Sequence, residues 1–274
     1  MRSHQTSRPG LGSSNIPWGA VSLYAILFVV SAWQLDARAH TGSAGGLVRL
    51  PFVARTDACA PIPRQTYVAI AVDGPHPNLP AESHPDLNLA VRGYELTSAP
   101  SQLVDYGGPS DGRAPQLDSL FSEERLPVFG GVYRAFDWNW TEMRRGQLIE
   151  DPPVTSLGLR AVQDEALCLP RSGYGIGDGC EALVLYADSQ HITFQYTRED
   201  SVAHGYTVHV ENVCVEPRLV ALYRACDANG RHHLPALRPQ QPFAQARGTE
   251  VVVAIRDHGR FLDPRSRKDW WQQY

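Results

Sequence analysis

Residues 181–215 read EALVLYADSQHITFQYTREDSVAHGYTVHVENVCV, and this stretch decides the fold. It contains three apolar runs rich in β-branched and aromatic residues, at 182–187, 192–196 and 206–215. Short polar breaks separate the runs, which is typical of an antiparallel meander of strands. The last run alternates between apolar and polar residues, so we expect one of its faces in the core and the other in contact with water.

The segments around the meander extend the sheet and add one helix. Residues 47–54, 66–72 and 248–256 read as further strands. Residues 217–229 are predicted to form a short helix, because Pro217 occupies its first turn, where the missing N–H costs nothing. The sequence therefore predicts a mainly β fold: an antiparallel twisted sheet or β-sandwich-like body with one short helix, at about 217–229, and long loops.

Length and composition set the domain organisation. The chain has 274 residues, of which 43% are hydrophobic, and a net charge of −4. These values suit a single β-rich domain over residues 49–264, with a loop-rich insertion at about 91–150 and a tail at 265–274. Because the sequence has no basic stripe, nucleic acid is not expected as a partner.

The N-terminus has the features of a targeting segment. Arg2 and Arg8 precede an uncharged apolar stretch at 16–33, and Ala37-Arg38-Ala39 fits a small-x-small cleavage site. We expect residues 1–39 to be a signal peptide, with an uncleaved N-terminal membrane anchor as the alternative. In both cases the body is extracytoplasmic, either secreted or tethered to the outer face of the cytoplasmic membrane. Membrane contact is expected only through this segment, and a Gly/Ser-rich flexible leader follows at 40–48.

Five cysteines are available for disulfides in an oxidising compartment: Cys59, Cys168, Cys180, Cys214 and Cys226. Proximity in the sequence favours Cys168 with Cys180, across a Gly-rich turn, and Cys214 with Cys226, which would join a strand end to the following helix. Cys59 would then remain single. Other pairings stay open, because five cysteines do not fix a connectivity.

The C-terminal half carries a family resemblance. Residues 253–264 read VAIRDHGRFLDP, residues 205–210 read GYTVHV, and residues 84–88 read HPDLN. This order resembles the lysostaphin-type, LytM-like zinc endopeptidases, whose opening H-x-x-x-D and closing HLHFE strand are followed by I-R-x-x-G and D-P. The resemblance covers about residues 155–264, with 84–90 as an outlying piece, and it implies the fold of that family.

The departures from the family pattern concern the zinc site. The H-x-x-x-D pair becomes His84 and Asn88, and the H-x-H pair aligns with Glu250-Val251-Val252. Only His84 and His209 remain as metal-ligand candidates, whereas catalytic zinc takes three protein ligands and a water. The resemblance therefore implies a pseudoenzyme without a cofactor. The alternative is a rearranged zinc site built from His84, His209 and Glu250, which are the candidate catalytic residues.

Aromatic residues supply the candidate binding groups. The run VYRAFDWNW at 132–140 is dense in rings, which either pack in the core or stack on sugars. The binding candidates are Trp138, Trp140 and Tyr206.

The sequence as a whole favours an exported, non-catalytic, endopeptidase-like module. Its expected partner is a cell-wall polymer (a glycan-peptide) or an envelope protein. One alternative is an active metal-dependent cell-wall hydrolase with a rearranged site. The other is a structural extracellular domain that binds no ligand.

Overall fold

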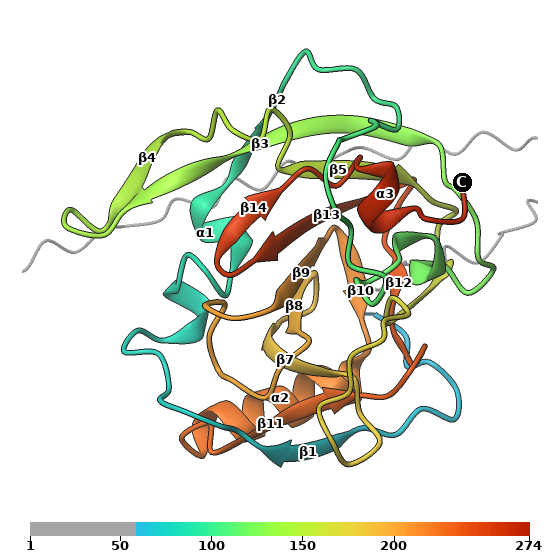
Figure 1. Ribbon diagram of the computed structural model, residues 1–274. Coiled ribbons are helices and arrows are strands. Elements are labelled where there is room, and N and C mark those ends of the chain that lie inside the picture. Colours follow the sequence, from blue (N-terminus) through green and yellow to red (C-terminus); the bar gives the residue numbers. More distant parts are fainter. Residues whose placement is uncertain (1–58) are drawn as a thin grey trace, which may run out of the picture. The chain divides into compact units, whose positions relative to one another are not determined.

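The computed structural model describes residues 59–274, so the predicted signal peptide (1–39), the leader (40–48) and the strand predicted at 47–54 lie outside the described residues. The described chain is mainly β, with two antiparallel sheets and three α-helices, which confirms the predicted fold class (Figure 1). In this part of the chain, no helix is both long enough and apolar enough to span a membrane.

The larger sheet has 11 strands, and the smaller has 3. In spatial order the main path of the larger sheet is β1 (Val68–Ala71), β11 (His233–Leu237), β7 (Ala182–Ala187), β8 (His191–Gln195), β9 (Tyr206–Glu211), β13 (Glu250–Asp257), β5 (Ser156–Arg160), β3 (Phe129–Asn139) and β2 (Tyr94–Leu96). Off this path, β14 (Arg260–Leu262) pairs with β13, and β4 (Arg144–Leu148) pairs with β3. The smaller sheet contains β10 (Val213–Val215), β12 (Pro242–Ala246) and β6 (Ala166–Cys168). The helices are α1 (Leu89–Arg92), α2 (Pro217–Ala228) and α3 (Arg267–Trp270), with short 3-10 helices η1 (Ala81–Ser83) and η2 (Leu117–Leu120).

The meander forms as the sequence predicts. Strands β7, β8 and β9 are consecutive antiparallel neighbours, with Phe194 opposite both Val184 and Val208. The predicted strand at 206–215 is split, because Asn212 adopts a left-handed backbone with φ of 60° and sends β10 into the smaller sheet. Asn tolerates this conformation better than most residues.

The predicted helix is α2, and a capping carboxylate fixes its start. Glu216 accepts hydrogen bonds from the backbone N–H groups of Arg218 and Leu219, at 2.7 and 3.0 Å. These donors have no partner inside the helix, so the carboxylate satisfies them. Its negative charge also interacts favourably with the positive end of the helix dipole. Pro217 occupies the first turn, as expected.

Residues 91–150, predicted as a loop-rich insertion, also contribute strands to the main sheet. They contain β3, an 11-residue strand that pairs with both β2 and β5 in the main sheet. Leu117, Leu120 and Phe121 of the same range lie in the main apolar core. The local composition of this segment is rich in turn-forming residues and therefore predicts loops. Strand β3 and the buried residues form because of contacts with distant strands, which local composition does not reveal.

The polar face of β9 is covered, although the alternating pattern predicts contact with water. Thr207 and His209 are fully buried, and Glu211 is 3% exposed. Thr193 of β8 lies opposite His209, and its hydroxyl donates to the Leu87 carbonyl at 2.6 Å, which brings the segment before α1 over this face. The His209 ring stacks on Phe261 of β14. The segment before α1 and strand β14 therefore cover this face.

The tail packs against the body. Trp270 and Trp271 are buried, and their indole N–H groups donate to the backbone carbonyls of Asp263 and Pro264, at 2.8 and 2.9 Å. Buried rings with satisfied N–H groups are core residues. The tail is thus part of the fold.

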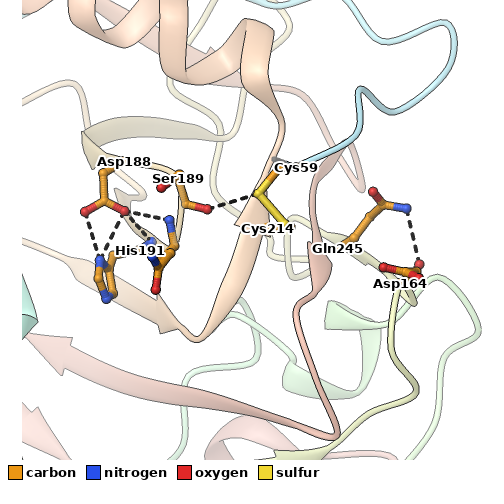
Figure 2. The surroundings of a disulfide bond; sticks show 8 residues. Cys59, Asp164, Asp188, Ser189, His191, Cys214 and Gln245 are labelled. Carbon is orange, nitrogen blue, oxygen red and sulfur yellow. Dashed lines mark hydrogen bonds and ion pairs between the residues drawn. A yellow bond between two sulfur atoms is a disulfide. The ribbon is translucent and has the colours of Figure 1, made fainter. Parts of the chain in front are cut away.

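The disulfide differs from the predicted pairs. Cys59 is bonded to Cys214 of β10, across a sequence separation of 155 residues (Figure 2). Cys168, Cys180 and Cys226 are free thiols, so both predicted pairings, Cys168 with Cys180 and Cys214 with Cys226, are wrong. The bond fastens the segment that leads into β1 to the smaller sheet.

Candidate functional site

Two adjoining hollows form the candidate site. They have volumes of about 660 and 600 Å³, and both are lined by Arg92, Arg256, Gly259 and Arg260. We call the larger the first hollow and the smaller the second hollow. The hairpin of β13 and β14 lies beside the end of α1 (Figure 1). Because the hollows share these four residues, we treat them as one candidate site.

The two hollows differ in their remaining walls. The first hollow includes the side chains of Tyr106, Asp137, Ile149, Phe261 and Trp270. The second hollow includes His76, His84, Asp86, Trp140 and His258. Aromatic rings alongside charged groups allow stacking and charge-assisted hydrogen bonds within one site.

Arg92 and Arg256 form the floor shared by the hollows, and Asp86, which lines only the second hollow, joins them. Asp86 Oδ1 accepts from Arg92 Nη2 at 2.6 Å and from Arg256 Nη1 at 2.8 Å. Burial acts to raise the pKa of Asp86, but the charges and hydrogen bonds of Arg256 and Arg92 outweigh it and hold the pKa at about 2. Asp86 is therefore ionised at neutral pH.

Phe261 supports both guanidinium groups. They lie over its ring, with 5.7 Å from Arg92 Cζ and 4.7 Å from Arg256 Cζ to the ring centroid. Strand β14 delivers this ring because it pairs antiparallel with β13, placing Phe261 opposite Arg256. Cation–π contacts and backbone acceptors thus hold the two arginines in place.

His84 lies at the edge of the second hollow. Its Nδ1 accepts from the backbone N–H of Asp86 at 3.1 Å, and its ring packs edge-on against Trp140 with centroids 5.6 Å apart. Burial lowers the pKa of His84, with Asp86 opposing this shift and Arg256 adding to it. The ring is therefore neutral at pH 7, and because Nδ1 is an acceptor, its proton is on Nε2.

His209 is buried deeper, below the floor. Its Nδ1 lies 2.9 Å from the Thr193 hydroxyl. That hydroxyl already donates to Leu87, so it accepts from Nδ1–H. His209 Nε2 has no hydrogen-bond partner among the described residues. Burial, followed by the charge of Arg256, lowers the pKa of His209 far below its ordinary value.

Glu250 does not join the two histidines. His209 lies opposite Ala254, so Glu250 is four residues further along β13, or ~13 Å. Glu250 instead accepts from the Tyr133 hydroxyl at 2.8 Å and from the Gly131 N–H at 3.2 Å. Within residues 59–274, no group of three or more His, Cys, Asp or Glu side chains is arranged to hold a metal ion.

Asn88, at the other position of the resembled zinc site, has a structural role. Its side chain accepts from the Ala90 N–H at 3.1 Å and donates to the Glu82 carbonyl at 2.9 Å. It is the N-cap of α1. With Asn88 engaged in this way and Val252 at the aligned histidine position, the residues present do not fit the zinc site of the resembled family.

Of the three aromatic binding candidates, only Trp140 lines a hollow. It is 47% exposed at the end of the β3–β4 hairpin. Trp138 is half-buried, with its indole N–H unpartnered among the described residues. Tyr206 lines neither hollow, although its ring packs against that of Trp270, a wall of the first hollow, with centroids 5.6 Å apart. The structure therefore separates Tyr206 from the other two.

The sequence reasoning missed the arginine floor. In the sequence, Arg256 stands out only as part of the I-R-x-x-G resemblance, and Arg92 follows an apolar stretch without any recognised motif. The one available signal is Arg256 directly after the apolar run at 251–255, since a charge that is buried beside such a run requires a partner. Comparisons with protein-family models, curated proteins and solved structures found no match for this chain.

Proposed function

We propose that this protein is an exported, non-catalytic module that binds a cell-wall glycan-peptide in the two adjoining hollows. The observation that carries the proposal is the combination of the exposed Trp140 ring with an arginine floor a short distance away in the second hollow. A glycan-peptide presents both apolar sugar faces and charged peptide groups. Each has a chemical counterpart in these hollows.

The shape of the site supports a ligand of several sugar or peptide units. Each hollow lies within the range of about 300–1,000 Å³ that is typical of small-ligand sites. Because the hollows adjoin through Arg92 and Arg256, a ligand longer than one unit can occupy both. Tyr106 in the first hollow and Trp140 in the second hollow then provide aromatic rings on which sugar units at the two ends of the ligand can stack.

The fate of the resembled catalytic positions supports binding without cleavage. Glu250 is engaged by Tyr133 and by the Gly131 N–H, and His209 is fully buried. Neither group lines the hollows. A hydrolase would need its reactive groups within hydrogen-bond reach of the substrate.

Cosedimentation with insoluble cell wall tests the proposal. We expect the purified full-length protein to be retained, and Trp140→Ala to weaken retention about fivefold to tenfold through loss of ring stacking. Tyr274→Ala is the matched control, since Tyr274 is an exposed aromatic residue that lines neither hollow. If the wild type is not retained at all, the structural-domain alternative replaces the proposal.

The same samples separate binding from hydrolysis. We expect no soluble fragments to be released from the cell wall, with or without added zinc. Release that is abolished by a chelator and by His209→Ala would instead establish the rearranged hydrolase. Retention by envelope proteins after complete digestion of the glycan would identify a protein partner.

A further inference from the structure

The floor of the site has an excess of positive charge. Arg92 and Arg256 are 4% and 3% exposed, and both donate to the same oxygen of Asp86. Within residues 59–274, the only other carboxylate at ion-pair distance from either guanidinium is Asp137, 3.6 Å from Arg92 Nη1. The Asp137 side chain is 73% exposed, so water screens much of its charge. One buried positive charge is therefore poorly compensated.

The protein's own groups leave part of the hydrogen-bonding capacity of both arginines unused. Arg92 donates to the carbonyls of Pro85 and Phe136 in addition to Asp86. Arg256 donates from two nitrogens to the Gly259 carbonyl and from a third to Asp86. A guanidinium has five N–H groups, and each of these arginines uses three. Donors therefore remain on groups that line both hollows.

The rim adds a third cation. Arg260 is exposed, lines both hollows and forms no ion pair among the described residues. Among the described residues that line the second hollow, these three arginines face only the carboxylates of Asp86 and Asp200, and Asp200 is already paired with Arg231, so the excess positive charge attracts an anion there. Planar oxyanions match the guanidinium fork, because they accept two parallel hydrogen bonds.

We propose that Arg92, Arg256 and Arg260 form a binding site for an oxyanion, specifically the free carboxylate at the end of a peptide ligand. The carboxylate accepts from the unused N–H groups of Arg92 and Arg256, and Arg260 approaches it from the rim. Asp137 competes with the ligand for Arg92. This inference rests on the proposed function only for its choice of a peptide as the source of the carboxylate.

Calorimetric titration of the purified full-length protein tests the site with three probes. They are N-acetyl-D-alanyl-D-alanine, the same peptide with a C-terminal amide, and inorganic phosphate. We expect the free acid to bind at least about tenfold more tightly than the amide, because the amide lacks the charge that the arginines recognise. Tighter binding of phosphate than of the acid would assign the site to a phosphate group instead.

The affinities of three variants for the free acid test which residues form the site. Arg260→Gln should weaken binding of the free acid about threefold to tenfold, whereas Asp137→Asn should strengthen it by removing the competing carboxylate. Both residues are exposed, so neither change threatens folding. Arg224→Gln on α2 is the matched control, with the same change in charge outside the hollows. It should leave binding unchanged.

The outcomes separate this inference from the proposed function. Equal affinity for acid and amide, or no binding of either at millimolar concentration, overturns the oxyanion site even if cell wall is retained. Discrimination between acid and amide without retention by cell wall supports the oxyanion site and rejects the glycan-peptide proposal. An equal effect of Arg224→Gln and Arg260→Gln would reduce the observation to nonspecific attraction and also overturn the site.

Discussion

Glu211 is a carboxyl group whose surroundings differ sharply from water. It is 3% exposed, and Oε1 has no hydrogen-bond partner among the described residues. Its Oε2 lies 3.5 Å from Nε2 of His191, which in turn contacts Asp188. Burial raises the pKa of Glu211 to about 7, despite the opposing effect of His191. Folding therefore favours the protonated carboxyl.

Glu211→Gln should stabilise the protein above neutral pH. The folded-state pKa exceeds the unfolded value of about 4.3, so the stability that the wild type has in acid is lost as the pH rises through 7. Glutamine does not ionise and avoids this loss, which amounts to about 3 kcal/mol. Urea unfolding should show the variant as more stable at pH 8 and nearly equal to the wild type at pH 4.5. A less stable variant at pH 8 would show that the ion pair with His191 outweighs burial.

His209 gives the opposite dependence on pH. Its pKa is lowered on folding, chiefly by burial, so the stability present above about pH 6.5 is lost as the pH falls. His209→Asn keeps a donor for the Thr193 hydroxyl but does not titrate. Between pH 7.5 and 5.5 the variant should lose about 1 kcal/mol less free energy of unfolding than the wild type. Identical losses in chemical denaturation would show that His209 is not the titrating group.

At the level of elements, local patterns identified the meander and α2. The β-branched runs and the Pro217 signal are local, and both elements form where predicted. The alternation in β9 was local too, yet its polar face became buried. The covering residues, such as Leu87 and Phe261, come from distant segments that the strand's own sequence does not reveal. Tertiary contacts decided this face, as is general for strands.

The α3 segment offers a prediction about how the tail holds the body. Trp271 is fully buried, and its ring lies 5.3 Å from that of Phe129 on β3. Trp271→Ala should lower the free energy of unfolding by about 3–5 kcal/mol, because it leaves a large cavity. Tyr274→Ala, at an exposed position three residues later, should change it by less than about 0.5 kcal/mol. Equal, small effects in urea unfolding would show that the tail does not stabilise the body.

At the level of the whole molecule, the candidate site joins four parts of the chain. His84 precedes α1, Arg92 ends it, Trp140 lies at the β3–β4 hairpin, and Arg256 belongs to β13. The sequence singled out His84 and Trp140, because these residue types suggest chemistry by themselves. The arginines gain their importance from each other and from Asp86, and that proximity arises only through folding. Their role therefore could not be read from the sequence.

The disulfide shows the same limit of sequence proximity. Cys168 and Cys180 are close in the chain, but both remain thiols, and burial raises the pKa of Cys168 to about 11. Cys214 pairs with Cys59, which is 155 residues away. A disulfide requires the two Cα atoms to lie within about 7 Å of each other. The fold brings Cys59 beside Cys214 of the smaller sheet, with 5.2 Å between their Cα atoms.

Thiol counting and unfolding together test this closure of the chain. The unfolded, unreduced protein should contain three reactive thiols, whereas the pairs expected from the sequence would leave one.

Because the bond closes more than half of the chain, replacing Cys59 and Cys214 by Ser should lower the free energy of unfolding by about 3–5 kcal/mol. A reductant should have the same effect on the wild type and none on the double variant. Cys226→Ser is the matched control and should change stability little, since its half-buried thiol is free. A single thiol in the unfolded wild type would contradict the observed pairing and restore the local pairs.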